Sequence, residues 1–235
     1  MIIIMTHTLV TGASQNHFKS VCQLLTSTYS RPMFDIIIVY DLGLTEESYQ
    51  YIAKHFKVIL RKFDYSRYPS FFDINVNCGE YAWKPALLWE AAQEVKEGLL
   101  LWCDAGNVLT TESYHVFPVI KRQGIYSPIS LGSVDEWTHP RMQSFFNIGC
   151  HDPVLCYPPR NGAILGFDLD QPAVIEFMKK FNSLAHIKEC IAPEGSSRAN
   201  HRQDQALFTI LYYQYSQYNL WEIEQYGTHT HIDID

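Results

Sequence analysis

Apolar and polar positions follow two periods along the chain, and stretches with one period alternate with stretches of the other. Short apolar runs rich in β-branched residues cover residues 2–10, 34–42, 57–63, 99–104 and 162–169. Apolar residues recur at helical spacing over residues 16–29, 44–55, 80–96, 171–182 and 202–214. Buried strands joined by crossover helices predict an α/β fold, in which helices flank a mostly parallel central sheet.

The periodicity weakens between residues 107 and 159, where Pro and Gly are frequent, and we expect long loops there. The chain has no internal repeat, low-complexity segment or obvious linker, and its 235 residues fit one domain. Ligands of such sheets bind beyond the carboxyl ends of the strands. The small and polar residues at positions 11–17, 40–43 and 104–107 are therefore the candidate site loops.

Composition disfavours several classes of protein. The net charge of −7 and the lack of a Lys/Arg-rich run argue against a nucleic-acid-binding protein, which needs a basic face. The six cysteines show no C-x-x-C spacing, so a zinc or redox motif is not expected. We expect reduced thiols, with Cys150 and Cys156 as the pair to check. Without a signal sequence or an apolar run of about 20 residues, the sequence predicts a soluble, cytoplasmic protein with no membrane span.

The stretch TLVTGASQNHF, residues 8–18, looks like the opening of a short-chain dehydrogenase. Asn16 and Phe18, however, stand where that motif needs glycines to approach a pyrophosphate. None of the fifteen tyrosines has a lysine four positions later, so the catalytic pair of those enzymes is missing as well. The polar side chains of Thr11, Ser14 and Asn16 are better suited to hold a base and a ribose.

Two segments of the first half carry candidate chemistry. Asp104 ends an apolar strand, where a carboxylate either binds a divalent cation or caps the next turn. Lys84 lies at the start of a predicted helix. The positive end of that helix suits a diphosphate, although a solvated lysine is the simpler reading.

Three segments of the second half are further candidates. Asn161-Gly162 precedes a strand and is either a sugar-binding turn or only a turn. Asp204 opens a helix, where its side chain either reaches a ligand or simply complements the helix dipole. The His and Asp residues near position 230 either complete a metal site or form a frayed, solvated tail.

Taken in order, these motifs resemble the GT-A glycosyltransferases, which are Rossmann-like members of the nucleotide-diphospho-sugar transferase superfamily. More closely, the chain resembles the DUF1647 group of glycosyltransferase-like proteins. The residues that carry this likeness are 16–18 (NHF), 36–44 (IIIVYDLGL), 81–85 (YAWKP) and the strand ending in Asp104. The resemblance covers most of the chain. It implies one GT-A-like domain over residues 1–235, with a nucleotide-binding half (1–107) and a loop-rich acceptor and sugar-binding half (108–235).

The second half is similar to retaining GT-A enzymes of the glycogenin and bacterial galactosyltransferase type. Their strand N-A-G-V-L-L is matched by residues 161–166 (NGAILG), and their helix opening D-Q is matched by residues 204–205. One departure concerns their D-x-D motif, which here reads Asp104-Ala105-Gly106 and lacks the second carboxylate. Either Asn107 replaces it, or a histidine near the end of the chain does, or no metal binds. Dependence on Mn²⁺ or Mg²⁺ is therefore left open.

The resemblance implies a glycosyltransferase that uses a nucleotide-sugar donor, with UDP as the expected nucleotide, and a glycan acceptor. The D-Q match favours retention over inversion at the anomeric carbon. If no metal binds, Lys84 and Arg202 are the cations available for the diphosphate. The implied site residues are Thr11, Ser14, Asn16, Lys84 and Asp104 for the nucleotide, Asn161, Gly162 and Arg202 for the sugar, Asp104, His229 and His231 for a metal, and Asp204, Gln205 and the rival base Asp152 for catalysis.

Other classes of protein remain in competition with this expectation. A non-catalytic protein that binds a nucleotide sugar or a carbohydrate could use the same fold, because fold does not fix function. The missing second carboxylate favours that alternative. A nucleotidyltransferase is disfavoured, since no Gly-rich basic segment follows the first strand.

Overall fold

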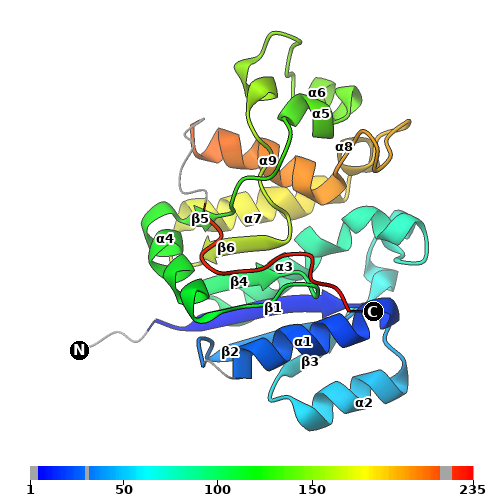
Figure 1. Cartoon of the computed structure of the whole chain (residues 1–235). Helices are drawn as coiled ribbons and strands as arrows, with labels where there is room; N and C mark the ends of the chain where they lie inside the picture. Colours follow the sequence, from blue (N-terminus) through cyan, green and yellow to red (C-terminus); the bar gives the residue numbers. More distant parts are fainter. Residues whose placement is uncertain (1–4, 30–31, 218–223, 235) are drawn as a thin grey trace.

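The computed structural model describes residues 5–29, 32–217 and 224–234. Within them one sheet has the strand order β3-β2-β1-β4-β6-β5 (Figure 1). β1 to β4 run parallel to one another, whereas β6 runs antiparallel to both β4 and β5. The predicted α/β fold with a mostly parallel sheet is confirmed. The strands are β1 (His7–Ala13), β2 (Ile36–Asp41), β3 (Ile59–Lys62), β4 (Leu99–Cys103), β5 (Ile125–Tyr126) and β6 (Ile164–Asp168).

Helices cover both faces of this sheet, which explains why its central strands are continuous apolar runs. The core clusters place α1, α2 and α4 on one face and α3, α7 and α9 on the other, with α1 and α2 in the lower part of Figure 1 and α7 and α9 in its upper part. Successive residues of β4 point to opposite faces: Leu100 and Trp102 join the core under α3, α7 and α9, and Leu101 and Cys103 face α4. The longer helices are α1 (Phe18–Tyr29), α2 (Glu46–His55), α3 (Trp83–Val95), α4 (Val116–Gln123), α7 (Pro172–Ala185) and α9 (Gln203–Tyr215).

The region expected to form long loops, residues 107–159, holds more regular structure than the sequence predicts. It contains α4, β5 and the short helices α5 (Val134–Trp137) and α6 (Pro140–Phe145). Elements of two to six residues are too short for periodicity to identify. Another short helix, α8 (Lys188–Ile191), precedes the loop before α9. Residues 2–4 of the first predicted strand lie outside the described residues.

A left-handed turn shifts the start of α3 from the predicted position 80 to Trp83. Residues 77–81 have φ values between 48° and 62°. Gly79 is required within this turn, because a Cβ atom there would lie 2.3 Å from the carbonyl oxygen of Phe72. The indole N–H of Trp83 donates to the carbonyl of Cys78 at 3.0 Å. The turn and this hydrogen bond fix where the first residues of α3 point.

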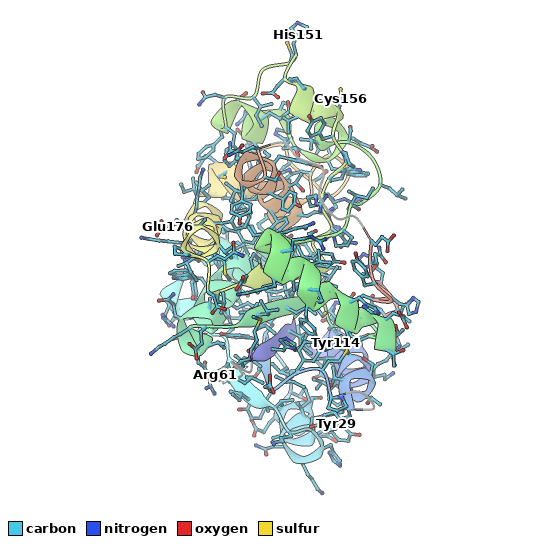
Figure 2. All side chains as sticks on the ribbon, turned by 90° about the vertical axis from the view of Figure 1, so that its left-hand side faces the viewer. Tyr29, Arg61, Tyr114, His151, Cys156 and Glu176 are labelled. Atoms are coloured by element: carbon cyan, nitrogen blue, oxygen red, sulfur yellow. The ribbon has the colours of Figure 1, made fainter. Side chains whose placement is uncertain are left out.

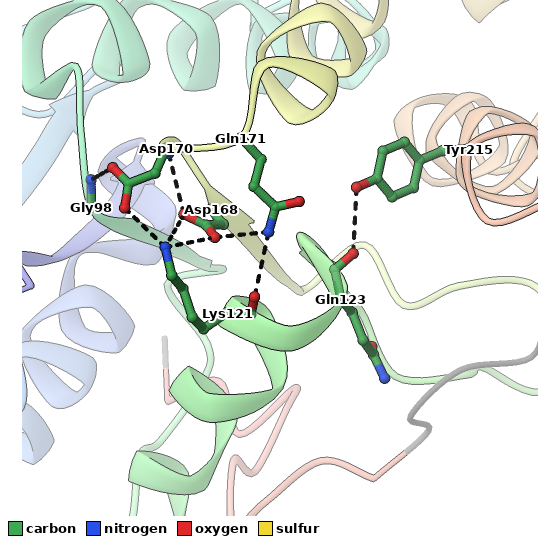
Figure 3. Close-up of polar contacts among 7 residues, drawn as sticks. All are labelled: Gly98, Lys121, Gln123, Asp168, Asp170, Gln171 and Tyr215. Carbon is green, nitrogen blue, oxygen red and sulfur yellow. Dashed lines mark hydrogen bonds and ion pairs between the residues drawn. The ribbon is translucent and has the colours of Figure 1, made fainter.

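A polar cluster lies at the amino end of β4, opposite the carboxyl ends of the parallel strands (Figure 3). The ammonium of Lys121 contacts Asp168 at 3.1 Å and Asp170 at 3.0 Å. Asp170 also accepts a hydrogen bond from the backbone N–H of Gly98, which precedes β4. These contacts join α4 to the corner between β6 and α7, and every charged group in the cluster has a partner.

Two expectations about the whole chain can be compared with the described residues. No helix in them is both long and apolar enough to cross a bilayer. Cys150 and Cys156 are exposed free thiols, which agrees with the expected reduced state.

Candidate active site

A cavity of about 960 Å³ opens at the carboxyl ends of β1, β2 and β4. All three predicted site loops contribute to its lining. The first half of the chain supplies one wall, and the second half supplies the opposite wall through residues 161–163 and 202–205. A cavity of this volume is in the range of small-molecule and cofactor sites.

Lys84 is the central group of the cavity floor. It comes from the first turn of α3, and only 4% of it is exposed. Its ammonium lies 3.0 Å from Asp104 Oδ1 and 2.9 Å from Asp204 Oδ2, and it donates to the carbonyl of Gly162 at 3.1 Å. An ammonium has three N–H donors, so each of them has an acceptor. Lys84 therefore connects β4, the Asn161 turn and the start of α9.

The charges of Lys84 and its two carboxylate partners shift the pKa values of Lys84 and Asp204. Burial alone would lower the pKa of Lys84, but the carboxylates of Asp104 and Asp204 outweigh it and raise the pKa above the ordinary value. Burial raises the pKa of Asp204, and Lys84 opposes that shift only in part. Burial is therefore the main reason why the Asp204 carboxyl is more basic than usual, and the negative charge of Asp104 adds to the shift.

Asp104 is held in place at the exit of β4 while part of it stays open to the cavity. Its Oδ1 atom accepts a hydrogen bond from the indole N–H of Trp102 at 2.7 Å. Its backbone N–H donates to the carbonyl of Ala163 at 2.9 Å. Its side chain is 32% exposed, in contrast to the buried Asp204. Asp104 is thus a fixed carboxylate with one face available to a ligand.

Residues 224–234 fold back across the loop that follows β4 and lie beside it (Figure 1). The backbone N–H of Ile232 donates to the carbonyl of Gly106 at 2.7 Å. A Cβ atom on Gly106 would lie 2.3 Å from Oδ1 of Asp233. The Asp233 carboxylate therefore occupies the space that a side chain at position 106 would take. Asp233 and His231 both line the cavity.

Comparisons with known structures show which proteins share this fold. The galactosyltransferase LgtC, in complex with donor and acceptor sugar analogs, superposes with a TM-score of 0.54 at 15% identity, over 85% of this chain and 68% of LgtC. Mouse xyloside xylosyltransferase 1 gives 0.52 at 12% identity, over 92% and 83% of the two chains. S. aureus TarS 1–349 gives 0.50 at 16% identity, over 89% and 55%. The chain has the GT-A fold.

A comparison of the sequence with known families finds one match. Residues 5–89 match the family described as "Protein of unknown function (DUF1647)". The resemblance drawn from the sequence is confirmed over that range, which contains NHF, VYDLGL and YAWKP. None of the curated proteins matches the chain.

GT-A enzymes often use a divalent cation, and the donor groups of this cavity can be tested for one. Asp104, His231 and Asp233 have suitable chemistry. Within the described ranges, however, no three His, Cys, Asp or Glu side chains lie close enough to share an ion. Oδ1 of Asp104 is already engaged by Lys84 and Trp102. This arrangement does not fit a resident metal, and we assign no step of the reaction to one.

The predicted nucleotide-binding residues do not all reach the cavity. Ser14 and Asn16 line it, and the Ser14 hydroxyl donates to the side-chain oxygen of Asn16 at 2.5 Å. Thr11 does not, because its position in β1 buries it completely between strands. Lys84 and Asp104 lie at the floor, but Lys84 uses its N–H donors within the protein.

Some of the predicted sugar-binding, catalytic and metal-binding residues line the cavity, and others do not. The cavity is lined by Asn161, Gly162, Arg202, Asp204, Gln205 and His231. Asp152 and His229 are not part of the lining. Asp152 accepts a hydrogen bond from the N–H of Val154 at 2.9 Å and follows His151, which Figure 2 shows at the tip of the molecule. His229 pairs with Val108 through its backbone, and its side chain is exposed.

Several lining residues carried no signal that sequence reasoning used. Arg198 belongs to a segment that reaches the cavity only through the fold, whereas Asp233 was among the candidate metal ligands near position 230. Tyr65 follows β3 and places an aromatic ring in the lining, and its hydroxyl donates to the carbonyl of Leu42. Lys62 could have been found, since it ends a parallel strand beside the candidate loop at positions 40–43.

Proposed function

We propose that the protein is a glycosyltransferase that transfers a sugar from a nucleotide-diphosphate donor, with UDP as the nucleotide, to a glycan acceptor. One observation carries the proposal. At the floor of the cavity Lys84 lies between Asp104, at the end of β4, and Asp204, at the start of α9. A donor that spans the cavity would have its nucleoside on one side of this group and its sugar on the other.

The donor's parts match the two walls of the cavity. The polar loop with Ser14 and Asn16, and the ring of Tyr65, suit a base and a ribose. The start of α3 is the positive end of a helix dipole, which favours a diphosphate. Asn161 and Gln205 offer amide groups to sugar hydroxyls on the opposite wall.

The transfer reaction separates charge, and the cavity's residues suit both ends of it. When the bond to the diphosphate breaks, the anomeric carbon becomes oxocarbenium-like and the leaving group carries negative charge. The Asp204 carboxylate would stabilise the sugar or take the proton of the acceptor hydroxyl. Burial raises its pKa, which makes it a better base. We propose retention at the anomeric carbon, following the D-Q match.

A turnover assay with a matched pair of variants tests the proposal. Purified protein is incubated with UDP-glucose, UDP-galactose, UDP-N-acetylglucosamine, UDP-xylose and UDP-glucuronic acid. The UDP that is released when the sugar is transferred to water or to a glycan acceptor is measured. We expect release from at least one donor. Asp204→Asn is expected to lower the rate by roughly a hundredfold or more, the usual contribution of a positioned acid–base group.

Asp152→Asn is the matched control, because it makes the same change outside the cavity. Its rate should equal that of the unaltered protein. A loss confined to Asp152→Asn would instead assign the base to the segment between α6 and β6. Failure of the unaltered protein to bind UDP at millimolar concentration would overturn the proposal as a whole.

One feature favours a second candidate function. Gly106 stands where many GT-A enzymes have the second carboxylate of D-x-D. A protein without that group could bind a nucleotide sugar and never transfer it. In the same assay, UDP binding without release from any donor would identify the non-catalytic binding protein.

A further inference from the structure

Two guanidinium groups lie at the second-half end of the cavity, and each is stacked on an aromatic ring. Cζ of Arg202, at the start of α9, lies 4.0 Å from the ring centre of Trp137 in α5. Cζ of Arg198, in the loop before α9, lies 5.2 Å from the ring centre of Tyr81. Both arginines line the cavity. Stacking holds a guanidinium plane in position while leaving its N–H edge free for an oxyanion.

Neither arginine has a carboxylate partner within the part of the chain that the structure describes. The nearest acid in the same loop, Glu194, pairs with Arg141 at 2.8 Å. Glu80 accepts a hydrogen bond from the side chain of Gln203. Burial, together with the positive charge of Arg198, lowers the pKa of Arg202, and the negative charge of Glu136 in α5 opposes this shift only in part. Two cations that repel each other across a cavity wall are an arrangement that a bound anion would stabilise.

The position of the pair indicates which part of a ligand the anion belongs to. The nucleoside wall is built at the ends of β1, β2 and β3, in the lower part of Figure 1. The arginines come from the loop between α8 and α9 and from the start of α9, in its upper part. The lining also includes Ser130 and Asn161, whose polar side chains suit sugar hydroxyls. The anion therefore lies on the sugar side of the cavity.

We propose that Arg198 and Arg202 recognise an acidic group on a sugar, a carboxylate in the first instance, so that the substrate is an acidic glycan or an acidic donor sugar. The two guanidinium groups supply charge-assisted hydrogen bonds, and a carboxylate can accept two from one guanidinium. The inference rests on the proposed function, which places the sugar at this wall.

Binding measurements separate the two sources of the acidic sugar. For the donor, the affinity of UDP-glucuronic acid is compared with that of UDP-glucose by calorimetry. For the acceptor, methyl glucuronide is compared with methyl glucoside by NMR titration in the presence of saturating UDP. We expect the unaltered protein to prefer the acid in one of these comparisons by roughly tenfold, the effect of about one charge-assisted hydrogen bond. Arg198→Gln and Arg202→Gln should each reduce that preference.

The control is Arg67→Gln, because Arg67 also stacks on a tyrosine, Tyr68, but does not line the cavity. It should leave the preference intact. Equal binding of acidic and neutral sugars by the unaltered protein would overturn the inference, and so would a preference that survives in both cavity variants. A loss of affinity for UDP itself in those variants would assign the arginines to the diphosphate instead. Absence of UDP binding to the unaltered protein would be a failure of the proposed function.

Discussion

The role that the sequence suggests for Lys84 differs from the one that the structure shows. Its place at the start of a helix suggests a free cation for a diphosphate. In the structure its partners, Asp104 and Asp204, are distant in sequence, and they hold it inside the protein. No local pattern can reveal a partner brought in by the packing of α3 against the second half.

Replacing Lys84 by Met should therefore destabilise the protein strongly. Two buried or half-buried carboxylates would remain without their shared cation, which typically costs about 3–5 kcal/mol when a buried pair is broken. The free energy of unfolding, measured with urea, checks this value.

Lys121→Met is the control for that experiment, since Lys121 also bridges two aspartates at 3.1 Å and 3.0 Å (Figure 3). Its side chain is 43% exposed and Asp168 is fully buried, but the side chain of Gln171 and the backbone N–H of Asp170 still donate to the Asp168 carboxylate. We therefore expect a smaller loss than in Lys84→Met. Equal losses in the two variants would contradict the interpretation of Lys84 as a buried charge.

His201 provides a second test at the residue scale, through pH. It is fully buried: its Nε2 atom bonds the carbonyl of Ile191 at 2.8 Å, and its Nδ1 atom accepts from the backbone N–H of His139. Burial lowers its pKa from 6.5 to about 4. The unfolded chain thus binds a proton below pH 6.5 that the folded protein does not, and stability falls as the pH drops from 6.5 toward 4.

Between pH 7 and pH 5 this group should account for about 2 kcal/mol of lost stability. Urea unfolding of the unaltered protein and of His201→Gln at both pH values measures it. The variant should show a smaller loss over this interval. An identical pH dependence in both proteins would mean that His201 does not titrate as the fold implies.

At the scale of elements, the position of the segment 224–234 depends on Gly106, which has no side chain. Gly106→Ala would place a methyl group 2.3 Å from Oδ1 of Asp233, so Asp233 must move. We expect faster hydrogen exchange at the amide of Ile232, which now donates to the carbonyl of Gly106. Gly149→Ala is the control, because nothing lies within 4 Å of a Cβ atom there. Unchanged protection at Ile232 would show that Asp233 rotates away without releasing the segment.

The elements also show where prediction from the sequence succeeds. Sequence patterns predicted the strands β1 to β4 and β6, because each lies in an apolar run. They also predicted the helices α1, α2, α3, α7 and α9, because each has apolar residues at helical spacing. The short elements between residues 107 and 159 were not, since a helix of four residues has no measurable period. The docking of residues 224–234 was also missed. It depends on backbone hydrogen bonds to a distant loop, and these leave no mark on the sequence.

The residues of the candidate site can likewise be separated into those that the sequence reveals and those that it does not. Residues at the ends of parallel strands were found, because topology brings those ends together. Thr11 was predicted as a nucleotide-binding residue, but it is fully buried and does not line the cavity. Arg198 was missed because only the packing of the loop before α9 against Tyr81 brings it to the cavity wall.

For the whole molecule, the two halves of the chain share one sheet and one core. β6, from the second half, pairs with β4 along its whole length. One core cluster contains residues of β1, β2 and α3 together with residues of α7 and α9. The Lys84–Asp204 contact joins the halves again at the cavity. Neither half can bury its apolar surface without the other.

We therefore predict that the protein unfolds in a single calorimetric transition and that UDP shifts this transition as a whole. A ligand that binds only the folded state stabilises it by about 2.7 kcal/mol at 100 times its dissociation constant. For a chain of this size that stabilisation corresponds to a rise of about 5–11 °C in Tm. The matched measurement is the Lys84→Met variant, in which the contact between the halves is lost and the transition should begin at a lower temperature. Two transitions, of which UDP shifts only one, would show that residues 1–107 and 108–235 fold as separate units and that the nucleotide is held by one of them alone.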